Sequence, residues 1–400
     1  MAKPKIRFKG YTDDWEQRKL RNLVDRVTRK NQDLVSELPL TISAQYGLID
    51  QNEFFDKRVA SKDVSGYYLI ENGEFAYNRS TSTDAPWGAI KRLDRYENGV
   101  LSTLYIVFRI KENNPVDSDF LVSYYSTNLW HKGIHEIAAE GARNHGLLNI
   151  APADFFETEL RIPQDIEEQE KIGKYFEKLE RLITLHQRKC EETKKLKKYM
   201  LQKMFPQNGQ TVPEIRFAGF TDAWEQRKLS ELSEKNLGGG TPKTSNESFW
   251  KGNIPWIQSS DLIEGSLFDV VPRKYISQEA VDKSATKLVP ENSMAIVTRV
   301  GVGKLAFMPF PYATSQDFLS LSELKTEPQF TAYVLYKKLQ SELNAVQGTS
   351  IKGVTKDELL TKKIMTPCYE EQEKIGSYLH SLDHLITLHH RKYTNTLKAP

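Results

Sequence analysis

The chain has 400 residues, of which 27% are charged and 39% hydrophobic, and its formal net charge is only +3 at pH 7. This length suits two globular domains plus helices, and the balanced charge excludes a polybasic tail or a disordered chain. A mildly basic balance permits nucleic-acid binding without requiring it. Two cysteines, Cys190 and Cys368, form neither a disulfide framework nor a metal-binding spacing. Because the start, MAKPKIRFKG, lacks an apolar export segment and no run is long enough to span a membrane, we expect a cytoplasmic protein.

The first half begins with a short segment, PKIRFKGYTDDWEQRKL at Pro4–Leu20, whose Trp15 suggests that it docks on the domain that follows. Alternating apolar runs at 67–80 and 101–110 predict strands, and residues 120–138 predict one helix. A loop with two glycines, GARNHG, closes this region before a long helix.

The long helix is predicted from about Asp165 to Met204. Apolar residues recur there with gaps that alternate between four and three, which is a heptad seam. The seam comprises Ile172, Phe176, Leu179, Ile183, His186 and Cys190, followed by Leu196, Met200 and Met204. A rod of about 40 residues is roughly 60 Å long and needs a partner helix along its seam.

The second half repeats both ends of the first. Residues 370–392 match residues 167–189 at 16 of 23 positions with an offset of 203, and residues 213–229 match residues 4–20 at 13 of 17 positions with an offset of 209. The chain is therefore an internal duplication. The regions between these ends, about 21–161 and 230–366, share almost no residues, although GTSIKG in the second takes the place of GARNHG. A common frame with different contents indicates two domains with different targets.

The second middle region begins with a loop rich in glycine and hydroxyl groups, GGGTPKTSNESFWKGNIPWIQSSDL at 238–262. Strands are predicted at 294–300 and 304–310 and a helix at 330–346. The order of strands, helix, glycine loop and long helix matches the first half, so both middle regions are predicted to be α+β domains of one fold.

Three patterns resemble catalytic or metal sites but favour simpler interpretations. The run Arg299–Leu305 lacks the first glycine and the hydroxyl of a phosphate loop, so it indicates a turn between two strands. Asp317 with Glu323 and Lys325 has too cramped a spacing for a nuclease. His186 and His389 occupy equivalent seam positions without further ligands nearby, which favours a role in helix register over metal binding. We therefore predict no catalytic, cofactor-binding or metal-binding residues in this chain.

Exposed cations, amides and hydroxyls on loops remain as candidates for DNA contacts, because such groups reach phosphates and base edges. In the first middle region they are Arg79, Ser80, Thr81, Lys91, Arg92, Arg143, Asn144 and His145. In the second they are Thr241, Lys243, Ser259, Ser260, Arg273, Lys274, Arg299, Lys304, Ser350 and Lys352.

The repeated EEQEKIG…LITLH segments, the block GGTPKTSNESFWKGNIPWI and the closing segments EGARNHGLLNI and GTSIKGVTKDELL resemble the specificity subunit of type I restriction–modification enzymes. The resemblance covers nearly the whole chain. It implies an α+β fold with two similar globular target-recognition domains, separated by two long helices that form an antiparallel coiled coil with pseudo-twofold internal duplication. It also implies that each domain reads one half of a bipartite, asymmetric sequence in double-stranded DNA.

The same resemblance implies a non-catalytic subunit that recruits two methylation subunits and, beyond them, restriction subunits. S-adenosylmethionine, ATP and Mg²⁺ then belong to those partners. The residues that we expect to contact partner subunits are Glu167, Glu168, Gln169, Lys171, Glu370, Glu371, Gln372 and Lys374. The alternative is a coiled-coil scaffold that binds proteins and no DNA.

The expected domains follow from the repeats and the resemblance. They are a first target-recognition domain at 1–163 with its opening segment at 4–20, a central helix at 164–205, a linker at 206–212, a second target-recognition domain at 213–366 with its opening segment at 213–229, and a C-terminal helix at 367–400.

Overall fold

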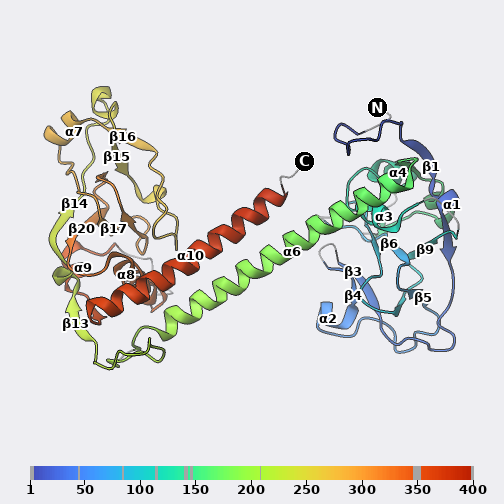
Figure 1. The fold of residues 1–400 in the computed structure, drawn as a ribbon, viewed down its shortest axis with the longest axis horizontal. Helices are drawn as coiled ribbons and strands as arrows, with labels where there is room; N and C mark the ends of the chain where they lie inside the picture. Colours follow the sequence, from blue (N-terminus) through green and yellow to red (C-terminus); the bar gives the residue numbers. More distant parts are fainter. Residues whose placement is uncertain are drawn as a thin grey trace. The chain divides into compact units, whose positions relative to one another are not determined.

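The structure is a computed structural model that describes residues 4–43, 46–82, 85–112, 116–138, 143–144, 147–207, 209–345 and 353–397 (Figure 1). The chain divides into two compact units, residues 1–184 with 396–400 and residues 185–395. The division falls inside the long helix α6 (Ile166–Lys203), so its first half belongs to the first unit and its second half to the second. Within the described residues, no helix has the length and apolar character that a membrane span requires.

The first unit is built on a four-stranded antiparallel sheet. Its strands lie in the order β2 (Val24–Val27), β9 (Ile106–Ile110), β6 (Phe75–Asn78) and β7 (Ala89–Arg92). The outer pairs are β1 (Glu16–Lys19) with β12 (Glu159–Ile162), β3 (Leu40–Ser43) with β4 (Gly47–Asp50), β5 (Tyr68–Glu71) with β8 (Asn98–Leu101), and β10 (Arg143–Asn144) with β11 (Leu147–Leu148). The helices are α1 (Leu20–Leu23), α2 (Gln51–Phe55), α3 (Ser118–Tyr125), α4 (His131–Ile137) and α5 (Pro152–Phe156).

The second unit contains a sheet with the same plan. Its strands lie in the order β14 (Ser233–Gly238), β20 (Phe318–Leu324), β17 (Ser293–Val297) and β18 (Leu305–Met308). β13 (Glu225–Lys228) pairs with β21 (Lys363–Thr366), and a smaller sheet has the order β16 (Lys274–Ile276), β15 (Ile254–Ile257), β19 (Ala313–Thr314). The helical elements are the short η1 (Leu229–Glu231), η2 (Glu247–Trp250) and η3 (Ser259–Asp261), α7 (Gln278–Asp282), α8 (Pro328–Ala345), α9 (Lys356–Thr361) and α10 (Tyr369–Leu397).

The two four-stranded sheets are equivalent strand by strand. In each unit the first strand of the sheet pairs with the last, the last pairs with the second, and the second forms a hairpin with the third. The pair β1–β12 in the first unit corresponds to β13–β21 in the second. The prediction of one α+β fold in both halves is therefore confirmed, although the sequences of the two sheets share almost nothing. The inner strands β6, β9, β17 and β20 are rich in apolar residues and are buried along most of their length, and such residues build the same sheet from different sequences.

One predicted helix of the first unit is two helices in the structure. α3 ends at Tyr125, where the hydroxyl of Ser126 donates to the carbonyl of Val122 (2.9 Å) and that of Thr127 donates to the carbonyl of Tyr124 (2.7 Å). Such side-chain bonds compete with continuation of the helix. The prediction of one helix over 120–138 was wrong because these local bonds outweighed the apolar pattern.

The second half of α6 lies antiparallel to α10, as Figure 1 shows in green and red. Cys190 Sγ lies 3.8 Å from the carbonyl oxygen of Ile386, and His186 Nδ1 lies 3.3 Å from His389 Nδ1. His186 and His389 are equivalent positions of the repeat. Equivalent residues of two antiparallel copies face each other only where the twofold relation passes between them. The histidines therefore mark the pseudo-twofold point of the helix pair, which agrees with their predicted role in register.

One predicted seam residue in the second half of α6, Leu196, is wrong, whereas Met200 and Met204 are confirmed. After Cys190 the seam continues through Thr193, Lys197 and Met200, which are half-buried, whereas Leu196 is 40% exposed. The gaps of three and four thus continue through a threonine and a lysine rather than through Leu196. Lys197 is accommodated because its amine lies 2.5 Å from a carboxylate oxygen of Asp383 on α10.

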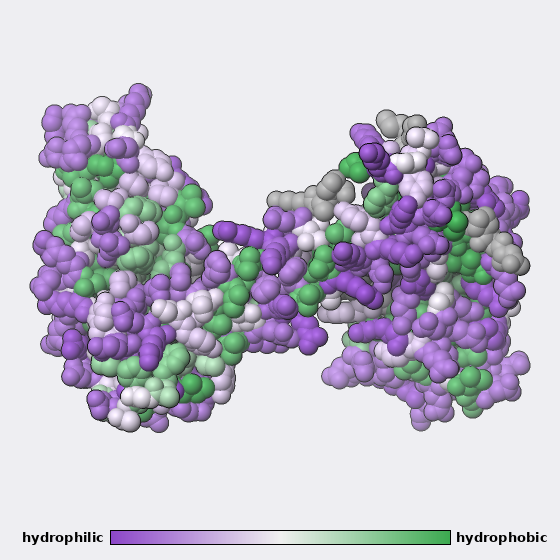
Figure 2. Space-filling view, in the orientation of Figure 1, coloured by the Kyte–Doolittle hydropathy of each residue, from purple (hydrophilic) through white to green (hydrophobic). Residues whose placement is uncertain are grey.

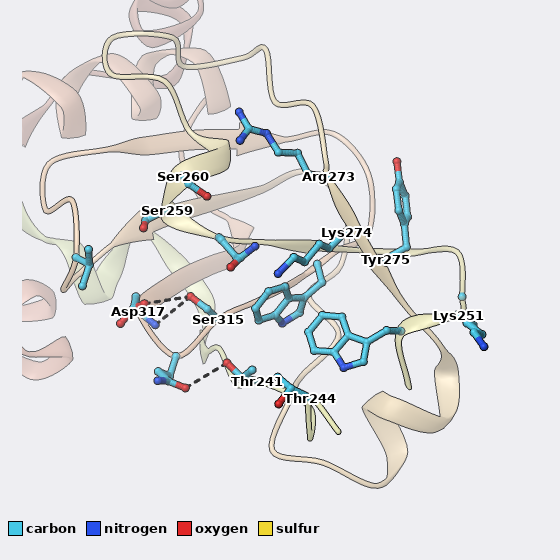
Figure 3. Close-up of a pocket in the computed structure, with 16 residues that line it drawn as sticks. Thr241, Thr244, Lys251, Ser259, Ser260, Arg273, Lys274, Tyr275, Ser315 and Asp317 are labelled. Atoms are coloured by element: carbon cyan, nitrogen blue, oxygen red, sulfur yellow. Dashed lines mark hydrogen bonds between the residues drawn. The ribbon is translucent and has the colours of Figure 1, made fainter. Parts of the chain in front are cut away.

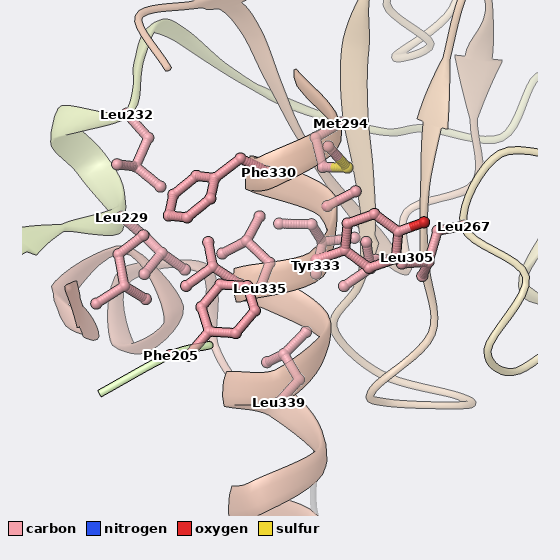
Figure 4. Packing of buried hydrophobic residues seen from close by; sticks show 14 of the residues in the cluster. Phe205, Leu229, Leu232, Leu267, Met294, Leu305, Phe330, Tyr333, Leu335 and Leu339 are labelled. Atoms are coloured by element: carbon pink, nitrogen blue, oxygen red, sulfur yellow. The ribbon is translucent and has the colours of Figure 1, made fainter. Parts of the chain in front are cut away.

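The main core of the second unit joins α8, the four-stranded sheet and the ends of both long helices (Figure 4). Phe330, Tyr333, Leu335 and Leu339 of α8 are buried there against Leu229 and Leu232, with Phe205 at the end of α6. The corresponding core of the first unit gathers Phe120, Phe108 and Phe155 around the sheet. Hydrophilic side chains cover most of the visible surface of each unit (Figure 2).

Candidate nucleic-acid interface

A cavity of about 1030 Å³ opens on the second unit among loops that follow or precede its strands (Figure 3). Its lining is rich in hydroxyls, amides and cations. The lining residues are Thr241, Thr244, Trp250, Lys251, Gly252, Trp256, Gln258, Ser259, Ser260, Arg273, Lys274, Tyr275, Val300, Ser315, Gln316 and Asp317. Five of the predicted DNA-binding residues therefore meet here, although up to 33 positions separate them in the chain.

Two glycines allow the first loop of this cavity to approach its neighbours. A Cβ on Gly239 would lie 1.9 Å from the carbonyl oxygen of Ser315, and a Cβ on Gly240 would lie 2.5 Å from that of Ala285. Backbone that comes this close to backbone excludes every side chain. The glycines of the GGGTP motif thus place Thr241 at the cavity, where its hydroxyl donates to the side chain of Gln316 (3.2 Å).

Arg273 is held at the cavity rim by a buried carboxylate. The side chain of Asp261 is fully buried, accepts a hydrogen bond from the backbone N–H of Gln258 (2.8 Å), and lies 3.5 Å from Nε of Arg273. The side chain of Arg273 is 69% exposed. Because the guanidinium is itself largely exposed, it is available to an anion from solvent.

Lys274 stands over two tryptophans. Its amine lies 5.7 Å from the ring centroids of both Trp250 and Trp256, and the two rings meet edge to face with centroids 5.0 Å apart. Trp256 is fixed in turn by a hydrogen bond from its indole N–H to the carbonyl of Gly240 (3.0 Å). Cation–π attraction of this kind orients an exposed cation without neutralising its charge.

A second cavity of about 940 Å³ adjoins the first at Val300 and is lined by Arg299 together with residues 353–357. Its loop is the turn between β17 and β18, where Gly301 and Gly303 have φ of +89° and +97°. The interpretation of this glycine run as a turn between strands is confirmed. Lys304, at the end of the turn, donates to the carbonyl of Ser259 (3.4 Å), which ties the turn to η3. Lys243 is exposed on the loop after β14.

In the first unit, two of the three arginines among the predicted residues, Arg79 and Arg92, are committed to the fold. Arg79 donates to the carbonyls of Leu104 (3.0 Å) and Ile150 (2.8 Å). Arg92 lies 2.6 Å from Asp94 and 2.8 Å from Asp119 and is only 18% exposed. Burial lowers the pKa of Arg92, but its hydrogen bonds to the two carboxylates more than offset this effect.

The other predicted residues of the first unit fall into two groups. Ser80 is exposed and Thr81 is half-buried on the loop after β6, and Lys91 is half-buried in β7 opposite Ala76. Arg143 and Asn144 form β10, whose side chains lie outside the described part, as do His145, Ser350 and Lys352.

The repeated EEQEKIG segments lie at the starts of α6 and α10, where half of their predicted partner-binding residues are buried. The carboxylate of Glu168 is fully buried and receives two hydrogen bonds from Arg7, at 2.6 and 2.7 Å. Its counterpart Glu371 receives two from Arg216, both at 2.8 Å. These bonds raise the pKa of both arginines. We name each bidentate pair the frame clamp of its unit, because it ties the opening segment to the long helix.

The neighbouring glutamines are used in the same way. Gln169 accepts from the backbone N–H of Asp117 (2.9 Å) and donates to the carbonyl of Pro163 (2.9 Å). Gln372 makes the equivalent bonds in the second unit, accepting from the backbone of Glu327 (3.0 Å) and donating to the carbonyl of Pro367 (2.8 Å). The buried groups Glu168, Gln169, Glu371 and Gln372 thus serve the fold and are not presented to a partner.

The remaining predicted partner residues are Glu167, Lys171, Glu370 and Lys374, and all four are exposed. Lys171 donates to the hydroxyl of Tyr11 (2.7 Å), and Lys374 lies 4.8 Å from the ring centroid of Phe220. The apparent nuclease set does not form, because Glu323 pairs with Lys235 (2.6 Å) and Lys325 pairs with Glu234 (3.0 Å), away from Asp317. No cluster of three metal-ligating side chains occurs among the residues with described positions.

Sequence reasoning missed several residues at the first cavity. Gln258, Tyr275 and Gln316 line it beside the predicted residues, and Lys251 adds a cation. Gln258 directly precedes the predicted residues Ser259 and Ser260 in the loop at 238–262, so the sequence could have indicated that its amide lies at the same surface. Gln316 lies on a different loop and carried no such signal.

The fold and this surface define a class of protein in which one duplicated frame carries two different sets of loops. Residues 221–399 match the family described as the type I restriction modification DNA specificity domain. The chain is 30% identical over 170 residues to the type I restriction enzyme MjaIX specificity subunit of Methanocaldococcus jannaschii, a match that covers 41% of this chain and 38% of that one. A match to the EcoR124I/EcoR124II specificity subunit of Escherichia coli is 33% identical and covers 40% of this chain and 41% of that one.

These two matches therefore span less than half the length of each relative. A putative type I restriction enzyme MjaX specificity subunit of M. jannaschii is 21% identical over 402 residues, covering 97% of this chain and 91% of that one. The solved type I restriction–modification S subunit of M. genitalium has the same fold, with a TM-score of 0.59 at 13% identity, over 98% of this chain and 96% of that one. The family match covers residues 221–399, and the repeated frame of the first half is equivalent to the frame of that region, so the chain is similar to type I restriction enzyme specificity subunits.

Proposed function

We propose that this chain is the DNA-recognition subunit of a type I restriction–modification complex. The observation that carries the proposal is the first cavity of the second unit, where Arg273, Lys274 and several hydroxyls and amides converge on one open surface. Arginine and lysine bind phosphates and guanine edges, while glutamine binds adenine edges. The similarity of the chain to type I restriction enzyme specificity subunits supports the same function.

A salt series tests DNA binding against the alternative of a scaffold that binds only proteins. A reader that contacts six to ten phosphates loses about 10³- to 10⁵-fold in affinity between 50 and 200 mM salt. Alanine at Lys274 should weaken binding to all sequences, whereas alanine at Lys363, exposed on β21, is the matched control and should change nothing. A DNA affinity that does not change with salt concentration would refute the proposal, as would an equal loss of affinity in Lys274→Ala and Lys363→Ala.

Each unit, in this proposal, reads its own half of a bipartite target. The support is that two equivalent sheets carry unrelated loops. Exchange of residues 21–161 for those of a relative should change one half of the target and leave the other intact, as mapped by sequencing methylated DNA from cells that carry the complex. A change in both halves would show that the units do not act independently.

The helix α6 sets the spacing of the two half-sites in this proposal. Four residues inserted after Glu180, in an exposed stretch of α6, add about 6 Å of helix. Since DNA rises 3.4 Å per base pair along each strand, the gap should widen by roughly two base pairs while both half-sites stay the same. An unchanged gap would exclude the helix as the ruler.

The chemistry of methylation and cleavage belongs, in this proposal, to partner subunits. The chain itself contributes recognition and binds two methylation subunits, beyond which restriction subunits assemble. S-adenosylmethionine, ATP and Mg²⁺ would bind to those partners. The mass of the assembled complex tests the stoichiometry, and a complex with one methylation subunit would contradict it.

A further inference from the structure

An apolar groove lies on the first unit where the opening segment, α3 and the start of α6 meet. It encloses about 400 Å³, and its walls include Ile6, Phe8, Phe120, Leu129, Tyr175 and Phe176. We name it the open groove. All its walls come from the first unit, and it is separate from the residues proposed to contact DNA.

The second unit has an equivalent surface that is filled. The repeat offset of 209 relates Ile6, Phe8 and Trp15 to Ile215, Phe217 and Trp224, and the offset of 203 relates Ile172 and Phe176 to Ile375 and Leu379. These counterparts all belong to the core that also contains Met204 and Phe205, the residues just past the end of α6.

Phe205 is the centre of the filled surface. It is 2% exposed, and its ring stacks on Phe330 with centroids 5.8 Å apart (Figure 4). It also meets the ring of Trp224 edge to face, with centroids 6.0 Å apart. The amine of Lys337 donates to the carbonyl of Phe205 (3.3 Å), and the backbone N–H of Ile215 donates to the carbonyl of Lys203 (2.9 Å). The end of α6 is therefore held by apolar contacts and by backbone polarity together.

Among the residues that the structure describes, none fills the open groove as Phe205 fills its counterpart, and the exposed fractions of the groove residues reflect this difference. Phe176 is 43% exposed while its counterpart Leu379 is fully buried, and Ile6 is 65% exposed. Within the described part of the chain, the N–H of Ile6 finds no acceptor like the one that Lys203 offers to Ile215. The groove thus presents the walls and the backbone donor of a helix-end site whose counterpart in the same chain is occupied.

We propose that the open groove binds the end of an α-helix supplied by another polypeptide, with a Met–Phe pair just past its last turn, like Met204–Phe205. The aromatic side chain would pack against both Phe120 and Trp15, as Phe205 packs against both Phe330 and Trp224. The last helical carbonyl would accept from the N–H of Ile6. The occupied groove of the second unit supplies the chemistry of this partner, because the same walls already select it there.

A labelled peptide with the sequence of Lys194–Gln207, added to the full chain, tests the proposal by fluorescence anisotropy. We expect saturable binding that weakens by about 10- to 100-fold when the peptide carries Phe205→Ala, since that is the contribution of one buried aromatic side chain. Leu129→Glu in the chain, at a 61% exposed position of the groove, should weaken binding by at least as much. Ile263→Glu, at a 67% exposed position of the second unit, is the matched control and should leave binding unchanged.

Three results would overturn the proposal. The first is no saturable binding, and the second is equal binding of both peptides. The third is binding that survives Leu129→Glu, which would mean that the peptide exchanges with Phe205 in the second unit. A second copy of this chain is the remaining possible occupant, and sedimentation of the chain alone tests for it. Self-association that Leu129→Glu abolishes would assign the groove to that second copy.

Discussion

The frame clamp of the first unit can be broken by a single substitution, Arg7→Met. The methionine keeps the aliphatic stem but removes both hydrogen bonds to Glu168, whose carboxylate is fully buried. Loss of one partner from a buried ion pair costs about 3–5 kcal/mol, because the remaining charge stays desolvated. This is a large share of the roughly 5–15 kcal/mol by which a typical domain is stable. For a unit of this size each kcal/mol shifts Tm by roughly 2–4 °C, so we expect a decrease of about 6–20 °C.

Scanning calorimetry of the free chain measures this shift. Glu167→Gln is the matched control, because Glu167 is exposed in the same helical turn and should change Tm by less than about 2 °C. Arg216→Met should produce the same loss in the second unit. The double variant Arg7→Met/Glu168→Leu should recover most of the stability, since an apolar pair can replace a buried ion pair at little cost.

A Tm change below about 2 °C for Arg7→Met would refute the reasoning, as would a double variant that loses the sum of the two single losses. Either result would mean that Glu168 is not held by the opening segment. Glu168 would then again be a candidate for contact with a partner subunit, as predicted for the EEQEKIG segment.

Three further outcomes follow from the second unit. Burial lowers the pKa of Lys337 to about 8. Between about pH 8 and 9.5 the unfolded chain therefore binds more protons than the folded chain, so the free energy of unfolding should rise with pH. Urea unfolding should show this rise in the natural chain and not in Lys337→Met. Burial and the charge of His186 lower the pKa of His389, and Lys189 and Lys392 add to this effect. The stability of the folded chain should therefore fall as the pH falls through 6.5 and below. Replacing both histidines by leucine should remove that fall in thermal melts. Asp383→Ala should lower the urea midpoint strongly, because it leaves Lys197 and the hydroxyl of Tyr333 without the carboxylate that each contacts at 2.5 Å; an unchanged midpoint would show that this network adds no stability.

The sequence by itself determined the features that depend on local pattern. The duplication, the long helix and the turn at Gly301 and Gly303 follow from repeats, periodicity and glycine placement, which neighbouring residues specify. The glycine-rich loop and its hydroxyls were visible for the same reason. From these local features the α+β class of both halves could be predicted, even though their strands share almost no residues.

Only the tertiary structure decided which of the predicted polar residues are available. Glu168 and Arg7 are 161 positions apart, and no local pattern shows that a charged residue at a helix start is fully buried by a distant arginine. The same holds for Arg92, which the start of α3 neutralises, and for Arg273 and Lys274, which the folding of separate loops brings beside Thr241. Lys197 occupies the seam position that the sequence pattern assigned to Leu196, because the carboxylate of Asp383 on α10 compensates the charge of Lys197. Burial and pairing depend on contacts between distant segments, and these contacts exist only in the folded chain.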